Sequence, residues 1–163
     1  MQMNTCLTKA LKKFISYAKK KKLQLLVCIE EDKAYITDGI MMFCIPKDEF
    51  ELKNFDVKYN LSLPSFYNNP EYLIEKCQKT TVSIDRYNVY KTDSNILCAF
   101  DSEYLNIASK MGININVLQA LSLNQRTKEF IIRNNHDKYG FLLLPISNKT
   151  CDVKAILKRI ILA

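Results

Sequence analysis

The sequence predicts an α+β fold: one domain of two helix-plus-three-strand half-repeats with antiparallel sheets, followed by a C-terminal amphipathic helix. Two observations predict it. Apolar residues recur at helical spacing in segments that begin near Thr5 and Asp101, and each segment is followed by short runs typical of strands. The second strand of each unit begins at a similar distance from its helix, at Lys33 and at Lys128. This recurrence predicts an internal duplication.

The predicted boundaries follow from these units. The domain covers residues 1–149, with half-repeats at about 1–60 and 80–149, and the C-terminal helix covers 150–163. In the first half-repeat a helix over 5–20, capped by Thr5, precedes strands over 23–29, 34–37 and 40–46. The Asp38-Gly39 pair marks the turn between the last two strands.

The second half-repeat is preceded by a connector over 60–69, which is rich in asparagine and contains Pro64. Pro70 then predicts the start of a short helix that ends near Gln78. Strands over 80–90 and 96–100 lead to a helix that Asp101 caps and Gly112 ends. The last predicted strands cover 117–123, 129–133 and 141–146.

The composition is that of a folded, soluble protein from a reducing compartment. At 163 residues the chain can bury a core without disulfides. No apolar run approaches the roughly 18 residues of a membrane span, and no secretory signal precedes the first helix, so we expect a cytoplasmic location. The six cysteines form no C-x-x-C pair. Cys28, Cys44 and Cys98 lie in apolar runs, which predicts core thiols and no metal site.

The positive charge is concentrated at the start of the chain. Residues 1–22 contain seven lysines and no acidic residue, whereas the rest of the chain holds 17 basic and 17 acidic residues. Lysines at three- and four-residue spacing on a helix can contact successive phosphates. A solvated helix face explains the pattern equally well, and a helix on a membrane surface is the less favoured third interpretation.

No catalytic site is predicted. The three glycines are isolated, so a glycine-rich phosphate-binding loop or dinucleotide site cannot form, and no cofactor is expected. His136 lies in a polar segment that reads as a hairpin tip, where a solvated side chain is a better interpretation than a general base. Asp38 is better explained by turn formation than by metal binding. These features predict a protein that is not an enzyme.

Three segments together resemble DNA sliding clamps of the bacterial polymerase III β-subunit type. Segment 34–39 (AYITDG) is similar to a strand and turn of that family, segment 100–105 (FDSEYL) to the start of its second helix, and segment 140–146 (GFLLLPI) to its closing strand. The resemblance covers residues 4–148 and is greatest to short, single-domain forms from phages and mobile elements. Clamps close as rings of six domains, so one domain per chain implies a homo-oligomer.

The resemblance implies a replication accessory protein that contacts the backbone of double-stranded DNA without reading its bases, with a polymerase or other replication proteins as partners. The residues expected to contact DNA are Lys9, Lys12, Lys13, Ser16, Lys19 and Lys20 on the first helix and Lys110 on the second.

The alternative is a protein-binding module with a clamp-like fold that engages or inhibits a replication or defence protein. Its expected contacts are Phe66 and Tyr67 in the connector and Ile156 and Ile160 in the C-terminal helix. A nuclease that uses scattered acidic residues is the third hypothesis.

Overall fold

The computed structural model describes residues 5–30, 32–47, 58–59, 73–122, 129–136 and 139–146. The helices and strands within these ranges are, in chain order, α1 (Thr5–Lys20), β1 (Leu26–Glu30), β2 (Lys33–Thr37), β3 (Met41–Pro46), β4 (Lys58–Tyr59), β5 (Leu73–Ile84), β6 (Tyr87–Thr92), β7 (Leu97–Asp101), α2 (Ser102–Ser109), β8 (Val117–Ser122), β9 (Ile131–His136) and β10 (Tyr139–Leu143). Neither of these helices has the length and hydrophobicity that crossing a membrane requires.

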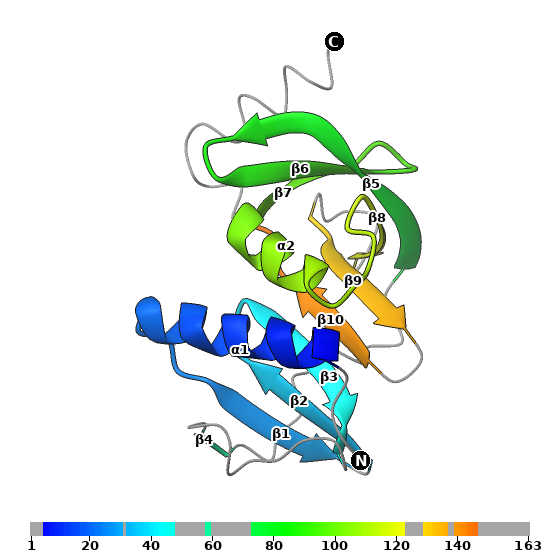
Figure 1. The fold of residues 1–163 in the computed structure, drawn as a ribbon. Coiled ribbons are helices and arrows are strands. Elements are labelled where there is room, and N and C mark those ends of the chain that lie inside the picture. Colours follow the sequence, from blue (N-terminus) through cyan, green and yellow to red (C-terminus); the bar gives the residue numbers. More distant parts are fainter. Residues whose placement is uncertain are drawn as a thin grey trace.

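The described strands all belong to one sheet, in the order β4-β1-β2-β3-β10-β9-β8-β5-β6-β7. Neighbouring strands are antiparallel, except that the two-residue β4 runs parallel to β1. Both helices lie on the same side of the sheet (Figure 1). We call this side the inner face and the opposite side the outer face.

The predicted α+β architecture of two half-repeats, at about 1–60 and 80–149, is wrong. β3 pairs with β10, with Phe43 opposite Phe141, so the strands of the two predicted units merge into one sheet. The described chain is mostly strand, and α2 has only eight residues. The order of elements along a chain does not determine which strands become neighbours. For that reason the repeated order of elements did not predict the sheet.

The short helix expected over 70–78 is also contradicted, because β5 begins at Leu73 and runs for 12 residues. Its first half pairs with β8, and its second half pairs with β6. Pairing with two neighbouring strands outweighs a weak local preference for helix. The single strand expected over 80–90 is interrupted by a turn at Asp85, whose φ is 51°.

Helix α1 forms with the predicted bounds and packs on the inner face. One side of the helix is buried, consisting of Leu7, Ala10, Leu11, Phe14, Ile15 and Ala18. The ring of Phe14 packs edge-on against the ring of Phe43 in β3, with 5.1 Å between the centroids. Burying each large side chain contributes about 1.5–3 kcal/mol. The buried side therefore fixes which side of α1 faces solvent.

The sheet curves so that β7 approaches the segments around β9 and β10. Ile146, beyond the end of β10, donates its N–H to the carbonyl of Ala99 in β7 at 3.0 Å. The rings of Phe100 in β7 and Phe130 before β9 lie 5.6 Å apart, although three strands separate β7 from β9 in the sheet. The curved inner face and the two helices thus enclose one main core.

The described cysteines are reduced, and four of them are buried: Cys28, Cys44, Cys77 and Cys98. The prediction that Cys28, Cys44 and Cys98 are core thiols is confirmed. Burial raises the pKa of the Cys77 thiol and of the Cys98 thiol to about 12. Cys6, near the start of α1, is exposed.

We expect thiol reagents to distinguish these cysteines in the folded protein at pH 8. The thiolate is the reactive form, and a pKa near 12 leaves roughly one molecule in ten thousand ionised at each buried site. Cys6 should be modified first, and Cys77 and Cys98 only after unfolding in denaturant. Mass spectrometry of tryptic peptides after timed labelling measures this order. Labelling of Cys77 or Cys98 at the rate of Cys6 would contradict the burial of these side chains.

Candidate nucleic-acid interface

The exposed side of α1 carries the lysines that are predicted to contact DNA. Lys9, Lys12, Lys13, Lys19 and Lys20 are exposed, as is Ser16. These positions recur at three- and four-residue spacing, so their Cβ atoms lie about 5–6 Å apart along the helix. The structure thus places the predicted α1 residues on one solvent-facing surface, which we call the lysine face.

No described carboxylate neutralises the lysine face. Among the described residues, the structure shows an ion pair only between Arg86 and Asp101, with Nε and Oδ2 3.7 Å apart. α1 has no acidic residue in its first turn, whereas Lys19 and Lys20 lie in its last turn, where cations favour the helix dipole. The lysine face is therefore a concentration of positive charge.

Helix α2 lies beside α1 and runs in the opposite direction. Tyr17 near the end of α1 contacts Tyr104 near the start of α2, with ring centroids 5.1 Å apart. At the other end, Gly112, just beyond α2, lies close to Cys6 near the start of α1. A methyl group placed on Gly112 would be 4.0 Å from Sγ of Cys6. Lys110, the exposed C-cap of α2, is therefore near the amino-terminal end of α1. It extends the positive surface onto the second helix.

The rest of the exposed surface of α2 is not basic. Glu103 and Asn106 are exposed, and Ser102 and Ser109 are half-buried. Asp101 caps the helix as predicted, because its Oδ1 accepts the N–H of Glu103 at 2.9 Å. A polyanion would therefore meet its cations mainly on α1.

Asp38, Tyr104, Tyr17 and Lys21 form a polar junction beneath the helices. Its first part is the turn between β2 and β3. Oδ1 of Asp38 accepts the N–H groups of Ile40 and Met41, each at 2.9 Å. Gly39 adopts a φ of +93°, which side-chain-bearing residues rarely adopt. The prediction that Asp38 and Gly39 form a turn is confirmed.

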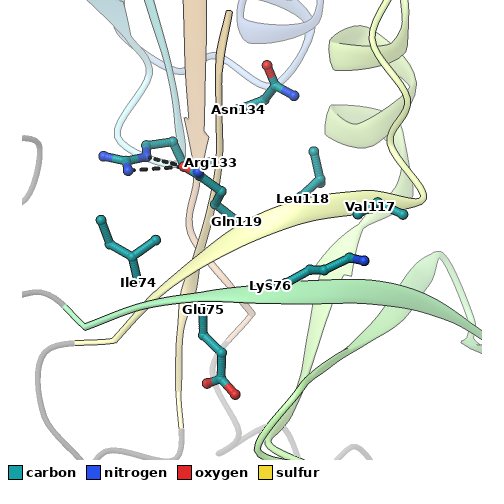
Figure 2. Close-up of a pocket in the computed structure, with 8 residues that line it drawn as sticks. All are labelled: Ile74, Glu75, Lys76, Val117, Leu118, Gln119, Arg133 and Asn134. Atoms are coloured by element: carbon teal, nitrogen blue, oxygen red, sulfur yellow. Dashed lines mark hydrogen bonds between the residues drawn. The ribbon is translucent and has the colours of Figure 1, made fainter.

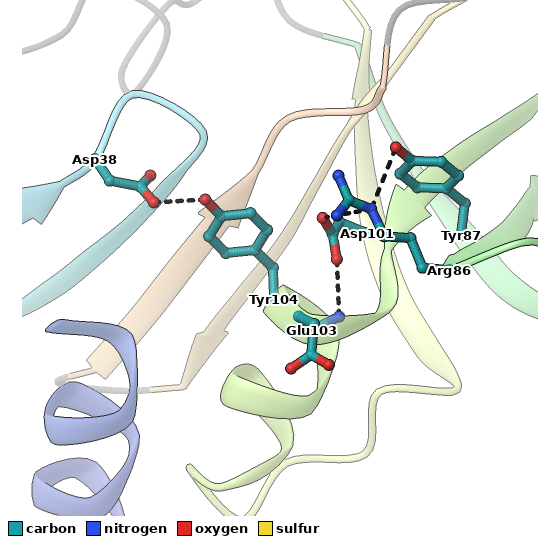
Figure 3. Close-up of polar contacts among 6 residues, drawn as sticks. All are labelled: Asp38, Arg86, Tyr87, Asp101, Glu103 and Tyr104. Atoms are coloured by element: carbon teal, nitrogen blue, oxygen red, sulfur yellow. Dashed lines mark hydrogen bonds and ion pairs between the residues drawn. The ribbon is translucent and has the colours of Figure 1, made fainter. Parts of the chain in front are cut away.

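The second carboxylate oxygen of Asp38 connects this turn to α2. The hydroxyl of Tyr104 donates to Oδ2 of Asp38 at 2.6 Å, and Figure 3 shows the ring pointing toward the carboxylate. Both residues are buried. Burial, and secondly this hydrogen bond, raise the pKa of the Tyr104 phenol above its ordinary value. Tyr104 therefore remains a hydrogen-bond donor at neutral pH.

Lys21 completes this junction instead of joining the lysine face. Its Nζ lies 4.7 Å from the ring centroid of Tyr17 and 4.9 Å from that of Tyr104. A cation over two aromatic rings is attracted by their electron-rich faces. Tyr17, Lys21 and Tyr104 thus hold the end of α1 against the start of α2. This junction cannot be predicted from the sequence, because Asp38 and Tyr104 are 66 positions apart and no local pattern pairs them.

Four predicted contact residues, Phe66, Tyr67, Ile156 and Ile160, lie outside the described residues, as do the connector over 60–69 and the C-terminal segment 150–163. Within the described ranges, no three His, Cys, Asp or Glu side chains are grouped as metal ligands.

Known protein families, curated proteins and solved structures were compared with the chain, and none of them matches it. The resemblance to sliding clamps stays a prediction.

We expect Tyr104→Phe to lower the free energy of unfolding by about 1.5–3 kcal/mol, because it leaves a buried carboxylate oxygen of Asp38 without its donor. Urea unfolding at pH 7, followed by circular dichroism, measures the change. The matched control is Tyr87→Phe. Its hydroxyl accepts a 3.4 Å hydrogen bond from exposed Arg86, and its loss should cost less than about 0.5 kcal/mol. Equal effects of the two substitutions would contradict the importance of the Asp38–Tyr104 hydrogen bond.

Proposed function

We propose that this protein is a non-enzymatic DNA-binding protein that contacts the backbone of double-stranded DNA through the lysine face of α1. The observation that carries the proposal is a row of exposed lysines without a carboxylate partner among the described residues. Such a row can neutralise successive phosphates and release their counterions. Contacts of this kind hold a duplex in place but do not read its bases.

The packing of α1 favours DNA over a membrane surface as the polyanionic partner. A helix that binds a membrane surface must insert its apolar side into the lipid. On α1 that side is occupied, because Leu11 and Phe14 are fully buried against the inner face. Only the charged side of the helix is free to bind, and it can do so without rearrangement of the core.

The resemblance to sliding clamps does not carry this proposal, because the half-repeat architecture it implied is wrong. A role in replication, with a polymerase or a second copy of the chain as partner, extends the proposal on that resemblance alone. DNA binding by α1 requires neither a ring nor a particular partner. It can therefore be tested on the isolated chain.

Neutralising four lysines on α1 should abolish DNA binding. The variant carries Lys9→Gln, Lys12→Gln, Lys13→Gln and Lys19→Gln, and glutamine preserves helix propensity. Fluorescence anisotropy with a labelled 20-base-pair duplex measures the affinity.

The matched control has the same net charge but changes four lysines away from α1, the exposed Lys33, Lys47 and Lys91 and the half-buried Lys79, to Gln. It should retain most of the affinity. Equal losses in the two variants would show that net charge alone drives binding, and an unchanged affinity in the α1 variant would exclude the proposal.

The affinity should also fall steeply with salt. If about four lysines neutralise phosphates, the logarithm of the association constant should decrease with the logarithm of the salt concentration at a slope of about −3.6. Titrations between about 50 and 200 mM KCl measure this slope. A shuffled-sequence duplex should give the same slope and affinity, because phosphate contacts carry no sequence information. A slope near zero would contradict a backbone-binding mode.

A further inference from the structure

A groove opens on the outer face of the sheet, because Lys76, Gln119 and Arg133 in its lining are strand neighbours of Cys77, Ala120 and Ile132, which point into the main core. It has a volume of about 360 Å³ and is lined by residues of β5, β8 and β9. Figure 2 shows the residues that line it, and β8 pairs with both β5 and β9. Since α1 lies on the inner face, this surface is separate from the lysine face.

Two cations and an amide form a cross-strand row in the groove. Lys76 lies directly opposite Gln119, and Gln119 lies directly opposite Arg133. Directly opposed residues of an antiparallel pair point to the same side of the sheet. Oε1 of Gln119 accepts hydrogen bonds from Nε and Nη2 of Arg133 at 3.1 and 3.0 Å, which orients the guanidinium (Figure 2).

The acidic residue among the groove's lining residues does not neutralise this row. Successive side chains of a strand point to opposite sides of the sheet, so Glu75 and Lys76 in β5 point in opposite directions. In Figure 2 the side chain of Glu75 points away from Lys76 and Arg133. Its carboxylate accepts hydrogen bonds from the backbone N–H and the hydroxyl of Ser94, the latter at 2.8 Å. The positive charges of the groove are therefore available to a bound anion.

Exposed apolar side chains flank the basic row. Ile74 is 58% exposed and Val117 is 39% exposed, and both line the groove. With Leu73, at the start of β5, they are the large hydrophobic residues that the structure shows as exposed among those it describes. Exposed apolar groups gathered beside oriented polar groups are typical of interaction sites.

We propose that this groove binds an extended segment of a partner protein that presents both acidic and apolar side chains on one side, at every second residue. Its carboxylates would pair with Arg133 and Lys76, and its apolar side chains would cover Ile74 and Val117. Arginine is suited to such pairing because its planar group donates two parallel hydrogen bonds to a carboxylate.

Two other occupants fit the groove less well. A single-stranded nucleic acid needs aromatic surfaces for its bases and a track of cations, whereas the groove's lining has no aromatic residue and two cations. The chain's own C-terminal segment carries Lys154, Lys158 and Arg159, which have the same sign of charge as the groove. Charge complementarity therefore favours an acidic segment over these two occupants.

The test uses the full chain and a fluorescein-labelled, end-capped decapeptide in which glutamate and leucine take turns at every second position, with serine between them, so that both lie on one side of the extended peptide. Fluorescence anisotropy should show saturable binding below about 1 mM. A peptide with lysine in place of glutamate, and one with serine in place of leucine, should each bind at least about tenfold more weakly, because each lacks one of the two complementary features.

Two double variants then locate the peptide. Lys76→Glu with Arg133→Glu reverses the charge of the groove, and Ile74→Ser with Val117→Ser removes its apolar flanks. Both pairs are at the protein surface, so circular dichroism should show an unchanged fold. Each variant should weaken binding of the glutamate–leucine peptide by at least about tenfold. The matched control Lys33→Glu, on an exposed residue of β2, should bind like the wild type.

Four results would overturn this proposal: no saturable binding, equal binding of the serine or lysine peptide, unchanged binding by the groove variants, or loss of peptide binding in the α1 lysine variant alone.

A dimer that dissociates on Ile74→Ser would assign the groove to a second copy, and DNA affinity lost with the Lys76→Glu/Arg133→Glu pair would assign it to nucleic acid. Duplex binding that persists in both groove variants keeps the DNA-binding proposal separate from this one.

Discussion

The burial of one side of α1 against the sheet is the interaction on which the other features of this protein depend. Phe14 packs on Phe43, and the apolar positions around it are almost completely removed from solvent. Because the helix has a single orientation on the sheet, its lysines project together into solvent. The charge of the surface is thus a direct result of how the core is packed. Any substitution that loosens α1 would disperse the lysine face as well.

The polar junction under the helices fixes their position on the sheet through hydrogen bonds, which have a preferred direction that apolar packing lacks. Asp38 is held by backbone N–H groups in its own turn and accepts the hydroxyl of Tyr104, so the start of α2 is fixed relative to β2 and β3. Lys21 and Tyr17 connect this point to the end of α1. Segments 34–39 and 100–105, far apart in the sequence, therefore meet in space. Their contact explains the buried carboxylate of Asp38 and the buried hydroxyl of Tyr104.

Much of the fold and the candidate site can be predicted from sequence wherever the signal is local. The bounds of α1, its buried side, the cap at Asp101 and the turn at Asp38 all follow from periodicity and side-chain chemistry within a few residues. Pairing between distant strands has no such signal. Hence the local sequence predicts a helix where β5 begins, and nothing in it predicts the β3–β10 pair that merges the two expected halves. The groove has no local sequence signal either, because Lys76, Gln119 and Arg133 become neighbours only when three strands align.

The pairing of β3 with β10 also affects how the chain can reach its folded state. β10 is the last described strand, yet it lies in the middle of the sheet between β3 and β9. A ribosome must therefore release nearly the whole chain before β3 gains its second neighbour. Contacts between such distant parts of a chain raise the contact order and slow folding. Until then, the apolar edge of β3 is open to pairing with other chains, and the protein is most prone to aggregation during synthesis.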